Sequence, residues 1–205
     1  MRFSTLFAAA SVVATGVSAQ NLYSGDSITD ALSLTAENYY GSPIPPWKPN
    51  HKPGWYYGKN PPEGIIYLLE EIFCELLELF PFCLQCPKPH KAPPPNQPPP
   101  PPEYTPTYNN LTCASQDGSF QTFGLVDTVQ DCQDMCDTVS GCIFVNAYHD
   151  NNDAGKGNST ELTCSLFSKC LDASSADNCA GQGQPDGSVD FITDSSGWCK
   201  SKPTA

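Results

Sequence analysis

The sequence predicts a small disulfide-rich α+β domain, a short helix packed on an antiparallel sheet, preceded by an amphipathic helix and a proline-rich linker. Eight of the 11 cysteines fall between residues 113 and 199, a dense and even set that is typical of a disulfide framework. The same region holds one capped helical segment and several short runs of β-branched and aromatic residues. A stretch that is half proline separates this region from the rest of the chain.

Residues 1–19 have the pattern of a secretory signal peptide: a basic start, the apolar run Leu6–Val13 and small residues before a cleavage point after Ala19. The apolar run is shorter than the roughly 20 residues that cross a bilayer, so no membrane span is expected. Two sequons, at Asn110 and Asn158, fit glycosylation on the same export route. We therefore expect a secreted glycoprotein of the extracellular space or cell wall.

The charge of the chain narrows its range of partners. The formal net charge is −12 at pH 7, and cleavage of the signal peptide removes Arg2, the sole arginine. A strongly acidic chain without guanidinium groups repels phosphates, which argues against binding of nucleic acid or of anionic membranes. We interpret the acidity as a source of solubility outside the cell. No cofactor is expected, and the partner should be an extracellular protein or a wall polysaccharide.

Residues 20–60 are predicted to form an irregular segment rich in proline, glycine and aromatic residues. Ser42–Pro53 contains too many prolines for a helix or a central strand. The aromatic side chains Trp47, Trp55, Tyr56 and Tyr57 lie in the second half of this segment. We expect them to anchor the segment on a neighbouring part of the protein, and a stacking surface for sugars is the alternative.

Residues 61–86 contain the longest periodic element before the linker, an amphipathic helix over residues 62–80. Apolar side chains fill one half of its helical wheel and glutamates the other half, which argues against a transmembrane helix. Prolines suit its start, and Pro81 ends it. Its apolar half must be buried against residues 20–60, against the C-terminal module or against a second copy of the chain, and these alternatives stay open.

Three cysteines of this region are left unassigned. Cys74 lies on the polar face of the predicted helix and could pair with Cys83 or Cys86 if the chain folds back. The remaining cysteine would then be left for an intermolecular disulfide or for a bond to another part of the chain. A homo-oligomer through helix 62–80 or through such a bond is one predicted assembly. The Cys83–Cys86 spacing also matches a redox or zinc half-site, but a structural disulfide is favoured because no second ligand pair accompanies it.

Residues 87–107 contain eleven prolines in 21 positions. Such a stretch adopts polyproline II and acts as a semi-rigid spacer. We predict a linker there rather than a ligand for a proline-binding domain. The cysteine module then spans residues 108–205, which is long enough for one small domain that depends on its disulfides.

Capping residues and runs of strand-forming residues predict where the helix and strands of the module lie. Asp127 or Thr128 can cap a short helix that runs through Cys136, since each has a polar partner three residues further on. Residues 150–160 are expected to form an exposed polar loop. Strands are expected at three places: residues 143–148, 162–167 and 189–193.

The spacing of the module's central cysteines resembles that of the apple/PAN module. The residues that carry the resemblance are Cys132, Cys136, Cys142-Ile143-Phe144 and Cys164-Ser165-Leu166-Phe167. In that family the helix cysteines bond to the central strand and to the residue just past the helix, and the terminal cysteines clamp the ends. The resemblance implies the pairs Cys132–Cys164, Cys136–Cys142 and Cys113–Cys199, with Cys170–Cys179 as an added local pair.

The amino-acid sequence of the module is also similar to that of secreted fruit-body-specific proteins of mushroom-forming (basidiomycete) fungi. The similar segments are Asn146–Asp150, Leu162–Phe167, Gln184–Ser188 and Gly197–Lys200. Apple/PAN modules are implicated in protein–protein and protein–carbohydrate contacts. The resemblances imply a non-enzymatic binding or adhesion protein of the extracellular matrix or cell wall. The alternative is a self-associating structural wall protein, with helix 62–80 as its interface and the module as cross-linker.

Other motifs are similar to known catalytic or metal-binding motifs. Gly25–Asp30 is similar to the nucleophile block of GDSL-type hydrolases, with Ser27 as nucleophile. A hydrolase is the weakest alternative, because no histidine has an aspartate three positions before it, as that family requires. Asp150–Gly155 is similar to a calcium loop, but an alanine occupies a ligand position and no glutamate closes the loop. His149 could contact a ligand, although a surface histidine is the expectation. We expect no catalytic and no metal-ligating residue.

Overall fold

The computed structural model describes residues 25–59, 71–88, 103–157, 159–181, 183 and 187–201. Its helices are α1 (Gly25–Leu32), η1 (Ala36–Gly41), α2 (Glu71–Glu78), α3 (Val129–Thr138), η2 (Ala154–Lys156) and η3 (Ala173–Ser175). Its strands are β1 (Tyr56–Tyr57), β2 (Tyr104–Leu111), β3 (Ala114–Ser115), β4 (Phe120–Val126), β5 (Phe144–Asn151), β6 (Leu162–Phe167), β7 (Ala176–Asn178) and β8 (Phe191–Lys200). The signal peptide, the start of helix 62–80 and most of the proline-rich linker lie outside the described residues. Within the described part of the chain, no helix is long and apolar enough to cross a membrane.

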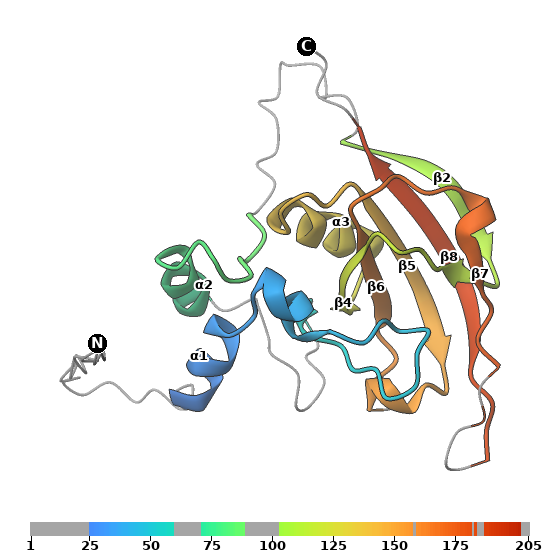
Figure 1. Cartoon of the computed structure of the whole chain (residues 1–205), viewed down its shortest axis with the longest axis horizontal. Helices are drawn as coiled ribbons and strands as arrows, with labels where there is room; N and C mark the ends of the chain where they lie inside the picture. Colours follow the sequence, from blue (N-terminus) through green and yellow to red (C-terminus); the bar gives the residue numbers. More distant parts are fainter. Residues whose placement is uncertain are drawn as a thin grey trace, which may run out of the picture.

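Six strands form one sheet in the order β1-β4-β6-β5-β8-β2. Neighbouring strands are antiparallel except β1 and β4, which run parallel. Helix α3 lies against one face of this sheet (Figure 1), and β3 pairs separately with β7. The prediction of a mixed α+β domain stabilised by disulfides is confirmed, since the fold is mostly sheet and holds five disulfides.

Helix α3 begins after Thr128, one of the two caps that the sequence allowed. Thr128 Oγ1 accepts a hydrogen bond from the backbone N–H of Asp131 at 3.1 Å, and Asp131 Oδ2 accepts one from the Thr128 N–H at 2.9 Å. Cys132 and Cys136 follow one turn apart and are fully buried. Their disulfides are the two that the resemblance implied: Cys132–Cys164 to β6 and Cys136–Cys142 just past the helix.

The other two disulfides of the module differ from the expected pairs. The expected pairs Cys113–Cys199 and Cys170–Cys179 are wrong, and the structure has Cys113–Cys179 and Cys170–Cys199. The reason is the register of β2 on β8, which places Cys199 opposite Thr105 near the start of β2. Cys113 lies beyond the other end of β2, where the pairing of β3 with β7 brings it beside Cys179.

The segment before the linker belongs to the same structural unit as the cysteine module. Strand β1 extends the edge of the sheet, with Tyr56 opposite Leu125 of β4. The N–H of Gly54 donates to the carbonyl of Phe123 at 3.1 Å, and the N–H of Leu125 donates to the carbonyl of Trp55 at 2.9 Å. Part of the segment predicted to be irregular is therefore an edge strand of the module's sheet.

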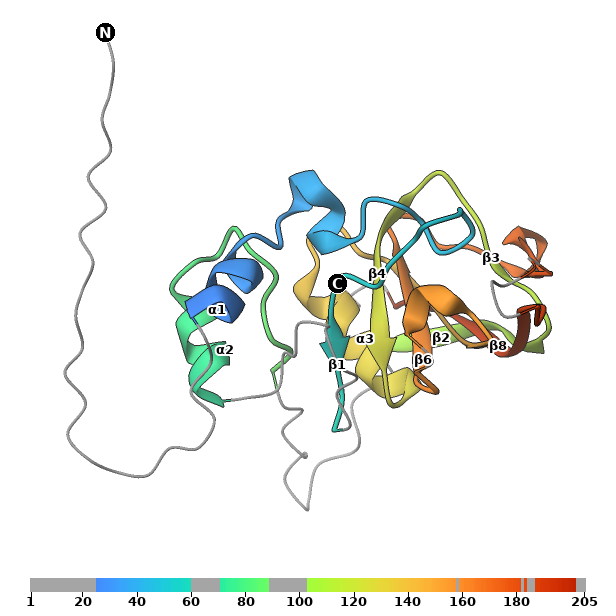
Figure 2. The same cartoon turned by 90° about the horizontal axis from the view of Figure 1, so that it is seen from below.

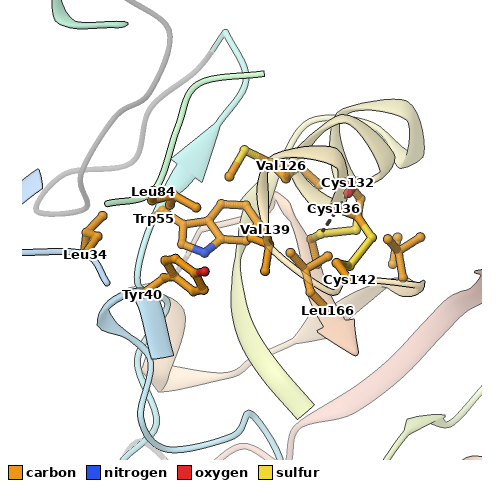
Figure 3. Packing of buried hydrophobic residues seen from close by; sticks show 14 of the residues in the cluster. Leu34, Tyr40, Trp55, Leu84, Val126, Cys132, Cys136, Val139, Cys142 and Leu166 are labelled. Carbon is orange, nitrogen blue, oxygen red and sulfur yellow. Dashed lines mark hydrogen bonds between the residues drawn. A yellow bond between two sulfur atoms is a disulfide. The ribbon is translucent and has the colours of Figure 1, made fainter. Parts of the chain in front are cut away.

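Trp55 anchors this attachment (Figure 3). Its fully buried indole lies in the core cluster that joins Leu84, from the chain before the linker, to Val139 after α3. Its Nε1–H donates to Thr122 Oγ1 of β4 at 3.1 Å. Glycine is required at position 124, because a Cβ atom there would lie 2.2 Å from the indole. Trp55 is an anchor, as predicted, and takes no part in a surface for sugars.

Helices α1 and α2 lie side by side on the flank away from the sheet (Figures 1 and 2). Leu77 of α2 is fully buried in the core cluster that also holds Leu34 and Trp55. Leu79, just past the helix, is 71% exposed. The described part of helix 62–80 therefore buries apolar surface within its own chain, against both the preceding segment and the module.

The structure assigns a bonding state to each of the three remaining cysteines, which lie in α2 and just after it. Cys74 is bonded to Cys86, one of the two partners that the sequence allowed. Cys83 is the free cysteine, and its thiol donates to the carbonyl of Phe80 at 3.1 Å. The alternative of a bond from the remaining cysteine to another part of the chain is wrong, because Cys83 is free. Cys83 is only 4% exposed, so an intermolecular disulfide would require this part of the chain to open.

Several element boundaries differ from those predicted, and the strand expected at residues 143–148 is Phe144–Asn151. Residues 104–107, assigned to the linker 87–107, are the first half of β2. Tyr104 is buried there, and its hydroxyl donates to Asp137 Oδ1 of α3 at 2.8 Å. The stabilisation from these contacts outweighs the low strand propensity of the adjacent prolines. The strand expected at residues 189–193 instead runs to Lys200 as β8, between β5 and β2.

Candidate functional site

A cavity of about 430 Å³ opens where β5 ends and β8 begins. Its walls come from the last residues of β5, the turn that contains η2, the chain just after that turn and the first residue of β8. The lining residues are His149, Asp150, Asn151, Asn152, Asp153, Lys156, Ser159, Thr160 and Phe191. This end of β5 is the arrowhead end in Figure 1, beside η2. The cavity is the candidate functional site.

Charged side chains of the turn are buried beside the cavity, so the expected exposed loop at residues 150–160 is wrong in part. Asp150 is 7%, Asp153 6% and Lys156 3% exposed. Asp153 caps η2, where its Oδ1 accepts from the N–H of Gly155 at 2.8 Å. The ammonium of Lys156 donates to the carbonyls of Asp150 and Glu161 at 3.3 and 2.6 Å. These bonds compensate the burial of the lysine.

His51 connects the chain before the linker to this turn. Its Nε2 lies 2.9 Å from Asp153 Oδ2, and its Nδ1 lies 2.8 Å from the carbonyl oxygen of Lys48. Burial alone would lower the pKa of His51, but the hydrogen bond and negative charge of Asp153 outweigh burial and raise this pKa above 6.5. The ion pair with Asp153 therefore attaches the segment to the wall of the cavity.

Asp150 is the least compensated charge in the cavity wall. Burial raises its pKa to about 7, helped by the negative charges of Asp153 and Asp190 and opposed by the positive charges of Lys156 and His51. Within the described residues, its Oδ1 has no hydrogen-bond partner. Asp190, just before β8, is 3% exposed, and its Oδ1 also has no partner among the described groups.

The rim of the cavity carries an exposed aromatic ring. Phe191 is 49% exposed at the start of β8. The amide of Asn151 donates to the Phe191 carbonyl, and that of Asn152 donates to the Val189 carbonyl, each at 3.1 Å. These bonds fix the rim beside the ring. Carboxylate, amide and hydroxyl groups next to an aromatic face can bind a sugar or a cationic group.

The acidic stretch that resembled a calcium loop is not built as a metal site. In the described part of the chain, no group of three His, Cys, Asp or Glu residues could hold a metal ion. The negative charges of Asp150 and Asp153 instead act on the buried Lys156. His149 is half-buried at the cavity, with its Nδ1 3.4 Å from Asp194 Oδ2. Apart from their spacing around a turn, nothing in the sequence indicates that Asp150 and Lys156 are buried.

The other candidate residues lie away from the cavity or outside the described residues. Asn110 is exposed on β2, in the left-handed region with φ of 55°. Asn158 lies outside the described residues, while the two residues that complete its sequon, Ser159 and Thr160, line the cavity. Ser27, the proposed hydrolase nucleophile, lies within α1.

Comparisons with known proteins return no relative. No family model, no curated protein and no solved structure matches the chain. The five disulfides fit a protein made in an oxidising compartment, as expected for secretion.

The protein is expected to become more stable as the pH falls from about 7 to about 4. The folded chain keeps the Asp150 proton over this range, because the pKa is about 7 there and 3.8 is the ordinary value. The unfolded chain releases that proton, so the free energy of unfolding rises on acidification by up to about 1.4 kcal/mol per pH unit. His51 acts in the same direction, since its contribution is complete below 6.5 and is lost as pH rises through its raised pKa.

Urea denaturation at several pH values measures this slope. The Asp150→Asn variant should show a flatter pH dependence than the wild-type protein. Asp30 on α1 is exposed, so Asp30→Asn is the matched control and should keep the wild-type slope. A slope that is unchanged in Asp150→Asn would contradict the assignment.

Proposed function

We propose that this chain is a secreted, non-enzymatic binding protein of the extracellular matrix or cell wall. Its ligand is a protein or a glycan, held at the cavity between the end of β5 and the start of β8. The observation that carries the proposal is the cavity itself, which combines a half-exposed Phe191 with buried carboxyl groups and ordered amides. Such a combination of one apolar face and a few converging polar groups is common at binding sites.

An apple/PAN-like architecture supports this proposal. A short helix lies on the sheet, with one disulfide from the helix to β6 and one to the residue past the helix, and these are two of the three pairs that the resemblance implies. The third implied pair, Cys113–Cys199, is absent. The module extends beyond that pattern, because the chain before the linker adds β1 to the sheet and His51 to the wall of the cavity.

Self-association is a second candidate function, favoured by one observation. Leu79 and Phe82, at the C-terminal end of α2, are 71% and 63% exposed. Exposed apolar residues that lie close together often mark an interaction surface. In this alternative the chain is a structural wall protein that assembles through the end of α2.

Replacing Phe191 with alanine should weaken retention of the full-length secreted protein on its polysaccharide ligand. Loss of one aromatic contact is expected to lower affinity by about five- to tenfold. Retention on insoluble chitin and on β-glucan measures the effect. Ile143→Ala is the matched control, because Ile143 is 41% exposed and adjoins the opposite end of β5.

Different outcomes separate the two candidate functions. Retention that falls in Phe191→Ala but not in Ile143→Ala supports binding at the cavity. No retention of the wild-type protein on either polysaccharide counts against glycan binding. If sedimentation then shows an oligomer that Leu79→Ser dissociates, self-association is the better account.

A further inference from the structure

We infer that the cavity beside Asp150 binds the ammonium group of an amino sugar, as found in a deacetylated, glucosamine-type polysaccharide. This inference rests on the proposed function and specifies its ligand class. The central group is Asp150, which is 7% exposed, lines the cavity and has an Oδ1 without a partner in the described part of the chain. A buried carboxyl group without a compensating bond is destabilising, and a bound cation compensates it.

The two cations already present in the wall bind groups other than the Asp150 carboxyl group. Lys156 directs its ammonium to the carbonyls of Asp150 and Glu161. His51 is paired with Asp153. The lysine shows that this wall accommodates an ammonium group at 3% exposure when oxygen atoms surround it.

A second carboxyl group strengthens the negative potential. Asp190 is 3% exposed, has an Oδ1 without a partner among the described groups and acts electrostatically on Asp150. Asp150 itself and the two carboxyl groups that act on it, Asp153 and Asp190, outnumber the two cations that act on it, Lys156 and His51, so the local formal charge is negative. A cationic ligand is therefore favoured over a neutral one at this place.

The rim favours an amino sugar over a peptide lysine. Phe191 offers a half-exposed aromatic ring for stacking against a sugar ring, and the hydroxyl-bearing Ser159 and Thr160 line the same cavity. A lysine side chain is a narrow flexible stem that would leave these groups unused. The net charge of −12 also attracts a polycation over long range and repels acidic polysaccharides.

Calorimetry on the full-length protein tests the inference with glucosamine oligomers and N-acetylglucosamine oligomers of equal length at neutral pH. Wild-type protein should bind the amino form about tenfold or more tightly. Asp150→Asn should abolish this preference, so that both oligomers bind with equal affinity. Asp30→Asn removes the same charge from an exposed site on α1 and should keep the preference.

The outcomes distinguish the inference from the proposed function. Equal binding of both oligomers by the wild-type protein would overturn the inference and leave glycan binding intact. Binding of neither oligomer would count against both. A preference that survives in Asp150→Asn, or equally tight binding of a lysine oligomer, would overturn the assignment of the ligand class to this cavity.

Discussion

Replacing Trp55 with alanine should lower the free energy of unfolding by about 3–5 kcal/mol. The indole is 0% exposed and joins the chain before the linker to α3 and β4. Its removal leaves a large cavity and an unpaired Thr122 hydroxyl, because Trp55 Nε1–H donates to Thr122 Oγ1. The strand pairing of β1 depends on the same contact, so attachment of the whole segment should weaken. Chemical denaturation followed by circular dichroism measures the change.

Trp47→Ala is the matched control for this prediction. Trp47 is only half-buried, where it packs edge-on against Phe120 and parallel to Phe167 with ring centroids 5.3 and 6.3 Å away. Removal of this tryptophan should therefore cost less than removal of Trp55. Equal losses in the two variants would show that Trp55 is not the main anchor.

Replacing both Cys132 and Cys164 with serine should destabilise the protein by about 3–4 kcal/mol. This disulfide joins α3 to β6 in the centre of the sheet and spans 32 residues of sequence. Without it the unfolded chain gains entropy in proportion to the logarithm of that loop length. Both sulfur positions are fully buried, so serine hydroxyls there add a further penalty.

The pair Cys136–Cys142 provides the comparison. It begins on the same helix and is also buried, but it spans only six residues of sequence. Its double serine variant should lose roughly 1.5 kcal/mol less than the Cys132–Cys164 variant. Thermal unfolding under non-reducing conditions measures both. The same loss in the two double variants would argue that loop closure is not the main contribution of the longer bridge.

The parts of the fold that could be predicted are those determined by local sequence. Thr128 and Asp131 form a capping box within four residues, so the start of α3 followed from the sequence. Strand β6 was predicted with its observed bounds, Leu162–Phe167, because its residues have high β propensity. Helix periodicity likewise predicted that α2 would bury an apolar face, which Leu77 does.

The parts that could not be predicted depend on pairing between distant residues. The partner of Cys113 depends on the register of β2 on β8, which no single strand specifies. The pairing of Tyr56 with Leu125 joins segments on either side of the linker, and parallel pairing leaves no turn signal between them. For the same reason the cavity was missed, because Asp150 and Lys156 are polar in sequence and buried only in the folded chain.

The parallel pairing of β1 with β4 means that non-covalent contacts, in addition to the linker, hold the two parts of the protein together. Among the described residues no disulfide joins the chain before residue 89 to the chain after residue 102, since Cys74–Cys86 lies wholly on one side and the other four bridges on the other. The parts adhere through the β1 backbone hydrogen bonds, Trp55 and the His51–Asp153 ion pair. Cleavage of the linker would thus yield two complementary fragments that stay associated as a nicked protein. Extracellular proteolysis could then pass unnoticed in the native state and be revealed only on denaturation.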